Sequence, residues 1–438
     1  MKKKAQIFTV PAEGNSMSPL LHSGDRVEYI QVPFSSLQLN DIILIYENKT
    51  LVTHRIIYKT NKTCITRGDN NSAADKTIQK DRVLAKAIRF QRKGVWYGMK
   101  DAYLMQSALY LGEIQKLAEL FRISKIPHVF LKGVLVSLRY EGTIPKRIYA
   151  DCDVLVKRDD QKNIEKIFKM LRYQLQERAL LRSSFRTEGE KSRSVLRFAG
   201  FLSRPSKNSG LPRNDRGPEV SFMKVVNGVR VVFDVHFEPV FLMTQLGGMN
   251  ALYSSKKLQL LGNEIIERGE KKRINGYTYS LCSPSDQILY LALHIFHHNF
   301  TDSIRYQLLD RVCRKSGRAS WKKVAATIRA YQLEGYTYGA FLLLDKYFKT
   351  PIPPLFLQAI RPSYLKTITT RLIVQHVDIF SQEPRVKAGI KRFIYIMLLS
   401  PGFIFFKCAI LFRFDVIVVG CKLIWNYISS IISHKRNE

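Results

Sequence analysis

The sequence predicts a multidomain α+β protein with a mostly-β first part, an α/β core, a helical half and an apolar tail. Its 438 residues exceed what one hydrophobic core of ordinary size organises. Short apolar runs cut by turn residues fill the chain up to about residue 98, where the apolar period becomes helical. From Ser283 the pattern is helical almost throughout. We therefore expect domains at 1–98, 99–280, 281–389 and 390–438.

Runs rich in β-branched residues characterise the first segment. The runs QIFTV, DRVEYIQV, DIILIY, TLVTHRIIY and DRVLAKAIRF are separated by turn sequences that include SGD, ENK and GDNNSAADK. This spacing predicts a small, mostly β domain. The basic start MKKK is followed by too short an apolar run for the core of a signal peptide.

The second segment alternates helical and strand-like patterns. A helical run from about 100 to 121 precedes the strand-like HVFLKGV, and CDVLV is followed by apolar residues at helical spacing. These patterns predict an α/β unit. Between 181 and 218 the chain is rich in Ser, Pro, Gly, Asn and Arg, which predicts a solvated, mobile basic loop.

Composition limits the partners and the compartment. Lys and Arg number 70 against 36 Asp and Glu, so the formal net charge is +34. A field of this sign attracts phosphate on a nucleotide, a nucleic acid or an anionic membrane surface. Nucleic acid is the least favoured of these, because the sequence shows no RNP-like aromatic strand and no GXXG loop of the KH type. Six single cysteines without a CxxC pair give no sign of a zinc ribbon or disulfide framework, and they favour a reducing, cytoplasmic compartment.

The tail carries apolar runs between 393 and 432 that Lys407, Arg413 and Asp415 interrupt. A membrane-spanning helix needs about 20 consecutive apolar residues, so these runs fall short. Two interpretations stay open. The tail is either an interfacial anchor on an anionic membrane or a set of helices that pack on the enzyme core.

The first group of candidate catalytic residues lies in the β segment. A serine hydroxyl becomes a nucleophile when a neighbouring base takes its proton and a third group orients that base. Ser16 lies in the turn GNSMSPLLHSGD, and His54 lies in the strand-like TLVTHRII, where a side chain is held on a rigid element. His22 is the other histidine nearby. Asp69 and Asp75 follow in RGDNNSAADK.

These motifs occur in a recognisable order over about residues 10–90. Ser-Met-x-Pro, GD, ND-I, V-x-HR-I and T-x-GDNN followed by Asp resemble the signal peptidase family, in the branch that uses histidine as base and shares its fold with LexA-type repressors. The resemblance implies a peptide or protein substrate, no cofactor, and an oxyanion held by backbone N–H groups around Ser16 and Met17. It also implies Ser16 as nucleophile, His54 as general base, Asp75 as the orienting acid and Asp69 as a second acidic position.

Two departures from this family keep an alternative open. Asn40 stands where the second GD motif normally has glycine, and the membrane helix that usually precedes the serine is not seen. The alternative is that the β domain is an inactive module that docks a peptide while only the core is an enzyme.

The second group of candidate residues lies in the α/β segment. In YADCDVLV, Asp151 and Asp153 alternate along a strand, so their carboxylates project from one face. Paired carboxylates raise each other's pKa unless a cation neutralises them, and Mg²⁺ prefers oxygen ligands. Asp234, in VVFDVHF, is the expected third carboxylate of a site for two metal ions.

The surrounding sequence resembles the polymerase-β-like nucleotidyltransferases over about 100–355. The motifs are LKG, then YADCDVLV, then Asp234-Val235-His236 and the helical LALHIFHHNF, and they are most similar to an uncharacterised bacterial family. The resemblance implies Mg²⁺ and a nucleoside triphosphate, with Asp234 as third metal ligand and general base. It implies nucleotide binding by Lys132, Gly133 and Arg147, although Lys132-Gly133 replaces the Gly-Ser pair of the wider superfamily.

Three histidines in LALHIFHHNF leave two interpretations. His294 and His298 share one helical face and could bind a metal. Together with His297, they are more simply interpreted as histidines satisfied inside a helical core.

Overall fold

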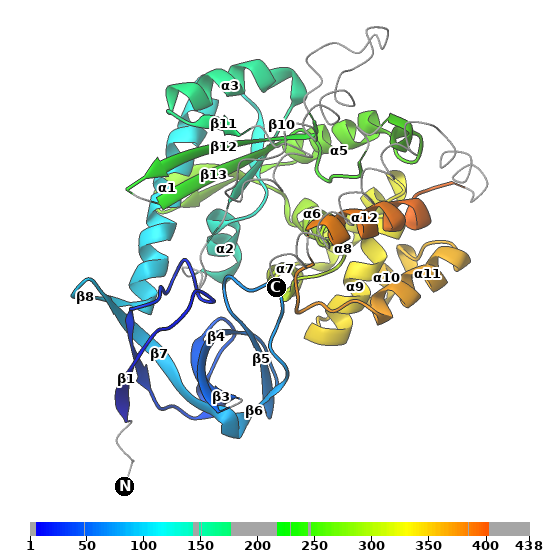
Figure 1. Ribbon diagram of the computed structural model, residues 1–438. Helices are drawn as coiled ribbons and strands as arrows, with labels where there is room; N and C mark the ends of the chain where they lie inside the picture. The colour runs from blue at the N-terminus through cyan, green and yellow to red at the C-terminus, as the bar shows by residue number, and fades with distance from the viewer. Residues whose placement is uncertain are drawn as a thin grey trace, which may run out of the picture.

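The computed structural model describes residues 6–47, 49–142, 149, 151–176, 217–227, 229–243, 247–383 and 385–402 (Figure 1). Arg147, nearly all of the predicted basic loop and the tail beyond residue 402 lie outside the described residues. Within the described ranges the chain is a mixed α/β protein, with a mostly-β N-terminal region and a helical C-terminal half. No helix of the described part has the length and apolar character needed to span a membrane.

The N-terminal β region, residues 6–98, forms one antiparallel sheet in the order β1-β2-β7-β3-β4-β5-β6, with β8 paired to β7. The alternation of buried and exposed residues along the strands explains why this segment forms a sheet with one buried face. In β2, for example, Val27 and Tyr29 are buried while their neighbours are not. The strands are β1 (Ile7–Pro11), β2 (Arg26–Ile30), β3 (Ile42–Glu47), β4 (Thr50–Lys59), β5 (Thr63–Arg67), β6 (Ile78–Gln79), β7 (Val83–Arg92) and β8 (Val95–Gly98).

The core is built on a second sheet in the order β11-β12-β13-β10-β9-β15-β14. Its central strand β10 is buried along its whole length, as expected of a strand covered on both faces. The strands are β9 (His128–Phe130), β10 (Cys152–Val156), β11 (Gln174–Gln176), β12 (Glu219–Val226), β13 (Val229–His236), β14 (Glu270–Ile274) and β15 (Tyr277–Leu281).

Helices cover this sheet on two sides. One face packs through Phe130 and Val154 against α1 (Met99–Ile123) and α3 (Gln161–Met170). The other face packs through Val129 and Leu155 against α5 (Ser255–Glu267) and the helical half. Alternate residues of one strand therefore belong to different cores, and Asp153, two residues before Leu155, faces the helical half.

The helical half begins with α6, which starts where the sequence provides a cap. Ser283 accepts a hydrogen bond from the Asp286 N–H, and Pro284 occupies the first helical position. The helices are α6 (Pro284–His297), α7 (Ser303–Arg314), α8 (Arg318–Ala330), α9 (Glu334–Phe348), α10 (Pro354–Ala359), α11 (Tyr364–Gln375) and α12 (Arg385–Leu399).

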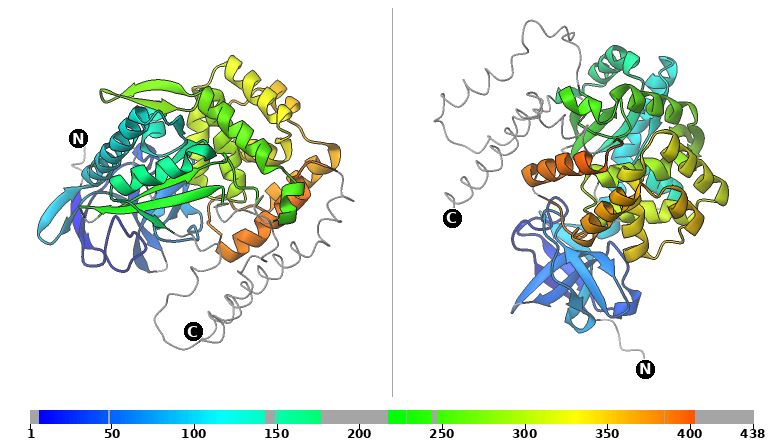
Figure 2. Two further views of the ribbon diagram at one scale, coloured as in Figure 1. Left: turned by 90° about the horizontal axis from the view of Figure 1, so that it is seen from above. Right: turned by 90° about the vertical axis from the view of Figure 1, so that its right-hand side faces the viewer.

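The β region packs against both the core and the helical half. In Figures 1 and 2 it is the blue part at one end of the molecule. Arg67 and Asp302 form a buried ion pair of 3.1 Å across this joint. Gln307 bridges it as well, since its side chain accepts from Asn40 and donates to the Ile57 carbonyl, each at 3.1 Å. The two parts therefore share buried polar contacts.

Candidate functional site

Three carboxylates meet on the face of the core sheet that looks toward the helical half. Asp153 and Asp234 are direct neighbours on the parallel strands β10 and β13. Asp151 lies two residues before Asp153 and therefore on the same side of the chain. Ligand atoms of the three side chains all lie within 4.8 Å of one another. The strand register thus brings together the three residues that the sequence predicts as metal ligands.

The donor atoms of this acidic cluster fit a divalent cation. His236 Nε2 lies 2.8 Å from one oxygen of Asp153, and Ser221 donates a 2.6 Å hydrogen bond to Asp234. The other oxygen of Asp153, Oδ2, is buried and accepts no hydrogen bond from the described residues. The ammonium of Lys132 lies 2.9 Å from this oxygen, and hard cations take such buried carboxylate oxygens as ligands. This oxygen is consistent with a metal-binding role.

Lys132 places a positive charge against two carboxylates of this cluster, Asp151 and Asp153. Its Nζ lies 2.9 Å from Asp153 Oδ2 and 3.3 Å from Asp151 Oδ1, which makes an ion pair rather than a directed hydrogen bond with Asp153. Burial would raise the pKa of Asp151, but the charges of Lys132, Arg305 and His236 outweigh it and hold that pKa below its usual value. Asp151 is therefore ionised at neutral pH and ready to bind a cation.

The turn from β9 to α2 (Val134–Glu141) positions Lys132. The Leu131 N–H donates to the Asp153 carbonyl at 3.0 Å, so the turn is fixed directly to β10. Gly133 follows with φ +93°, a left-handed conformation that favours glycine. The predicted pair Lys132-Gly133 therefore lies at the acidic cluster.

A second group of side chains lies in the β region. His54 Nε2 is 3.1 Å from Ser16 Oγ, and His54 Nδ1 is 2.6 Å from Asp75 Oδ2. Thr66 donates a further hydrogen bond to the same Asp75 oxygen. The order hydroxyl, imidazole, carboxylate is the one that activates a serine nucleophile. We refer to Ser16, His54 and Asp75 as the serine triad.

Local structure explains how Ser16 reaches His54. The neighbouring Met17 is buried in the core of the β region and anchors the turn. The loop after β5 packs against this turn and is fixed to it by a hydrogen bond of 2.8 Å from the Asn70 N–H to the Ser16 carbonyl. A Cβ at Gly68 would lie 2.5 Å from that carbonyl oxygen, a distance that backbone atoms do not tolerate. Glycine in GDNN is thus required by close approach.

Asp69, the second acidic position predicted from the sequence, pairs with Arg55 and not with the serine triad. It forms a two-pronged ion pair with Arg55, at 2.6 and 2.5 Å. Arg55 also donates to Tyr103 of α1 and to the carbonyl of Asn40. Asn40, the departure from glycine, adopts φ +69°, which asparagine tolerates better than most residues. His22 is exposed and lies outside the triad.

The histidines of α6 form a third group, next to the acidic cluster. The ring centroids of His294 and His298 are 4.7 Å apart, and those of His297 and His298 are 4.8 Å apart. All three side chains remain partly exposed, and His297 Nδ1 has no hydrogen-bond partner among the described residues. Burial and then nearby positive charges hold their pKa values well below 6.5. Of these three histidines, His297 therefore has one ring nitrogen without a partner among the described residues.

Sequence reasoning missed two arginines near these histidines. Arg305 of α7 acts electrostatically on Asp151, on all three histidines and on Arg392 of α12. No motif marks either arginine, and they lie 87 residues or more apart from each other and from Asp151 in the sequence. Only the folded chain brings them together.

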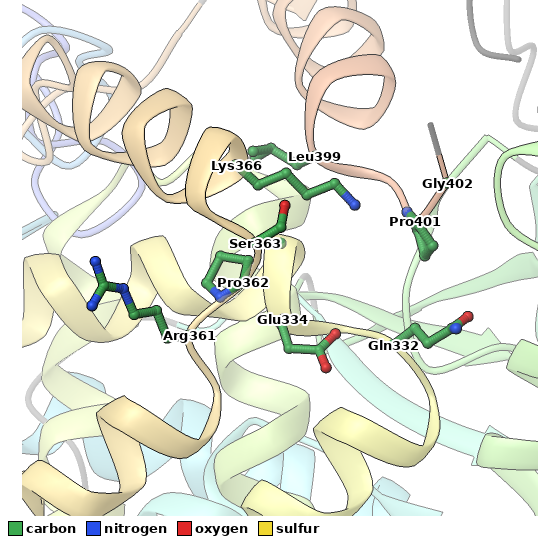
Figure 3. Close-up of a pocket in the computed structure, with 10 residues that line it drawn as sticks. Gln332, Glu334, Arg361, Pro362, Ser363, Lys366, Leu399, Pro401 and Gly402 are labelled. Atoms are coloured by element: carbon green, nitrogen blue, oxygen red, sulfur yellow. The ribbon is translucent and has the colours of Figure 1, made fainter. Parts of the chain in front are cut away.

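A separate hollow of about 280 Å³ lies where α9, α11 and the end of α12 meet (Figure 3). Its lining includes Glu334, Arg361 and Lys366. None of the candidate residues named above lines it. We therefore place the chemistry at the acidic cluster and the serine triad rather than in this hollow.

The acidic cluster and its lysine define the class of the core as a candidate metal-dependent transferase of phosphorylated substrates. A model of an uncharacterised nucleotidyltransferase family matches residues 95–349. Because this match covers more than half of the chain, the chain belongs to that family. Membership implies a nucleoside triphosphate as substrate. No curated protein matches the chain. The family match begins after the serine triad and carries no information about it.

Proposed function

We propose that the core transfers a nucleotidyl group from a nucleoside triphosphate to an acceptor hydroxyl, with divalent metal ions held by Asp151, Asp153 and Asp234. The observation that carries the proposal is the convergence of the three carboxylates within 4.8 Å on neighbouring strands. When bound, Mg²⁺ would neutralise charge that develops on the phosphate oxygens. The acceptor oxygen would form a bond to the α-phosphorus, and pyrophosphate would leave.

The chain's own residues have distinct roles in this proposal. Asp234 would accept the proton of the acceptor hydroxyl, and the hydrogen bond from Ser221 fixes its orientation. His236 holds Asp153 through one oxygen, and the other oxygen, which pairs with Lys132, is the one that a cation would take. Lys132 would meet a phosphate of the nucleotide, and the turn at Gly133 keeps it at the cluster. Arg147 remains a proposed phosphate ligand on sequence grounds alone.

The test is transfer of label from each of the four α-³²P nucleoside triphosphates in the presence of Mg²⁺, with pyrophosphate release as a second readout. Asp153→Asn should lower transfer by roughly 10²-fold or more, because it removes a charged ligand while keeping the shape. Asp159→Asn is the matched control, since Asp159 is exposed shortly after the same strand. Transfer that survives in Asp153→Asn, or that needs no divalent metal, would sink the proposal.

We also propose a second activity, hydrolysis of a peptide bond of the signal peptidase type by the serine triad. The specific observation in its favour is the pair of hydrogen bonds from Ser16 to His54 and from His54 to Asp75. In addition, the N–H groups of Ser16 and Met17 have no protein acceptor among the described residues. Such N–H groups can stabilise an oxyanion.

A fluorophosphonate probe, which labels activated serines, distinguishes this activity from a docking role. Labelling of the wild type should disappear in Ser16→Ala and persist in Ser23→Ala, because Ser23 is exposed in the next turn. If no labelling occurs at any pH between about 6 and about 9, the inactive docking module becomes the better description. The division at 1–98, 99–280, 281–389 and 390–438 stays part of this proposal.

A further inference from the structure

The helical half places an excess of positive charge beside the acidic cluster. The charge of Arg305 of α7 disfavours the charged form of Arg392 of α12. Arg305 pairs with Asp302 at 2.5 Å, but Asp302 is already shared with Arg67. One carboxylate thus serves two arginines, and the positive charge is not balanced locally.

Arg392 is the less compensated of the two. Burial lowers its pKa to about 10, with a further contribution from the charge of Arg305, which is unusual for a guanidinium. Its Nε is buried and has no hydrogen-bond partner among the described residues. The nearest acid, Glu383, already accepts from Lys391 and Asn299. Arg392 is half-buried, and a guanidinium whose Nε is buried without a partner is costly unless an anion completes it.

Phe241 connects Arg392 to the α6 histidines. The guanidinium of Arg392 lies 5.9 Å from the Phe241 ring centroid. The ring centroids of Phe241 and His297 are 5.6 Å apart, and the two rings pack edge to face. The Phe241 backbone also hydrogen-bonds to His297, and this leaves Nδ1 unpartnered among the described residues. Nδ1 would meet an anion only when protonated, and an anion beside it would favour that form.

We propose that Arg305, Arg392 and the three α6 histidines form a binding site for the phosphate groups of a ligand. Its position follows from Arg305, which acts on Asp151 and on all three histidines, so the site adjoins the proposed metal cluster. The part of the inference that concerns a nucleotide rests on the proposed transfer. Two sources of phosphate fit the chemistry: the β- and γ-phosphates of the triphosphate, and a phosphate monoester on the acceptor.

Isothermal titration of the full chain with sodium pyrophosphate in Mg²⁺ buffer tests the site. Arg392→Gln should weaken pyrophosphate binding by roughly tenfold or more, as expected for loss of a charge-assisted hydrogen bond. Lys387→Gln, an exposed position on the same helix, removes the same charge and should change affinity little. Arg392→Lys keeps the charge and should recover part of the affinity.

The site is refuted if wild-type protein fails to bind pyrophosphate at millimolar concentration, or if Arg392→Gln and Lys387→Gln bind it equally. Both outcomes are independent of nucleotidyl transfer, which is measured separately with Asp153→Asn. A nonhydrolysable triphosphate separates the two sources of phosphate. Displacement of pyrophosphate by this analogue assigns the site to the nucleotide, and simultaneous binding assigns it to the acceptor.

Discussion

Arg67 and Asp302 form a buried ion pair although 235 residues separate them in the sequence. Asp302 caps the start of α7, and it also accepts from Arg305 and Gln382. Burial would raise the pKa of Asp302, but Arg305 and Arg67 outweigh it and keep that pKa below its usual value. One ionised carboxylate therefore contacts side chains of both the β region and the helical half at this joint.

Asp302→Asn should destabilise the whole protein. The substitution leaves two largely buried guanidinium groups without their counter-charge, which costs about 3 to 5 kcal/mol in comparable buried pairs. Urea unfolding of the full chain measures it. Asp345→Asn, at an exposed position of α9, is the control and should change the free energy of unfolding by about 0.5 kcal/mol or less. Equal stability of the two variants would contradict a central role of Asp302.

Gly68→Ala should disturb the serine triad through the backbone. The added methyl would lie 2.5 Å from the Ser16 carbonyl oxygen, so the turn must move. We expect a loss of about 1 to 3 kcal/mol in stability and reduced labelling of Ser16 by a fluorophosphonate. Gly112→Ala is the matched control, because a methyl group added at this position of α1 would meet nothing within 4 Å and alanine favours helix. Unchanged labelling in Gly68→Ala would show that the close contact between residue 68 and the Ser16 carbonyl does not position Ser16.

Lys132→Met should strengthen the binding of a metal ion in the absence of nucleotide. The ammonium lies about 3 Å from two cluster carboxylates and competes with a cation for them. A unit charge near 4 Å contributes on the order of 1 to 4 kcal/mol between water and a partly buried site. Titration with Mn²⁺, followed by electron paramagnetic resonance, measures the change. Lys162→Met, exposed on α3, should leave Mn²⁺ affinity unaltered. Weaker Mn²⁺ binding in Lys132→Met would contradict the prediction that Lys132 competes with a metal ion for these carboxylates.

His128 should make stability depend on pH. Burial lowers its pKa to about 4, whereas the unfolded chain has the ordinary value of 6.5. Because the unfolded state then binds more protons below pH 6.5, stability falls as the pH drops toward 4 and the loss is complete below that value. His128→Phe, which keeps a ring between Phe121 and Phe130, should escape this loss.

The difference between wild type and His128→Phe isolates this effect from other titrating groups. Relative to wild type, the variant should gain about 2 kcal/mol in free energy of unfolding between pH 7.5 and about pH 5. Urea unfolding at both values measures it. A difference that does not vary with pH would mean that the pKa of His128 is the same in the folded and unfolded states.

Short motifs are sufficient to predict the fold class and both groups of candidate residues. Asp151 and Asp153 lie two apart in a strand, so their common face follows from the period of a strand. A change of apolar period near residue 98 marks the passage to α1. The resemblance to the signal peptidase family singles out Ser16 and His54, and the structure brings their side chains within 3.1 Å. Periodicity and turn chemistry are local properties, and a sequence displays them directly.

What sequence reasoning misses depends on contacts between distant segments. Arg305 and Arg392 show no motif, and their significance comes from the charges that surround them after folding. The sequence places Asp69 near the triad, but its partner is Arg55, the residue next to His54, whose side chain leaves the strand on the opposite face. Helical spacing favours core positions for the α6 histidines. It gives no information on hydrogen bonds, and the structure shows that one ring nitrogen, His297 Nδ1, lacks a partner among the described residues.

Gln307 bridges the β region and the helical half by accepting from Asn40 and donating to the Ile57 carbonyl. Each of these groups would be left without its partner if the β region were separated from the helical half. A recombination event that moved the β region onto an unrelated core would bring its buried polar groups but not the surface that satisfies them. A β region produced without the helical half is therefore expected to expose these polar groups to water.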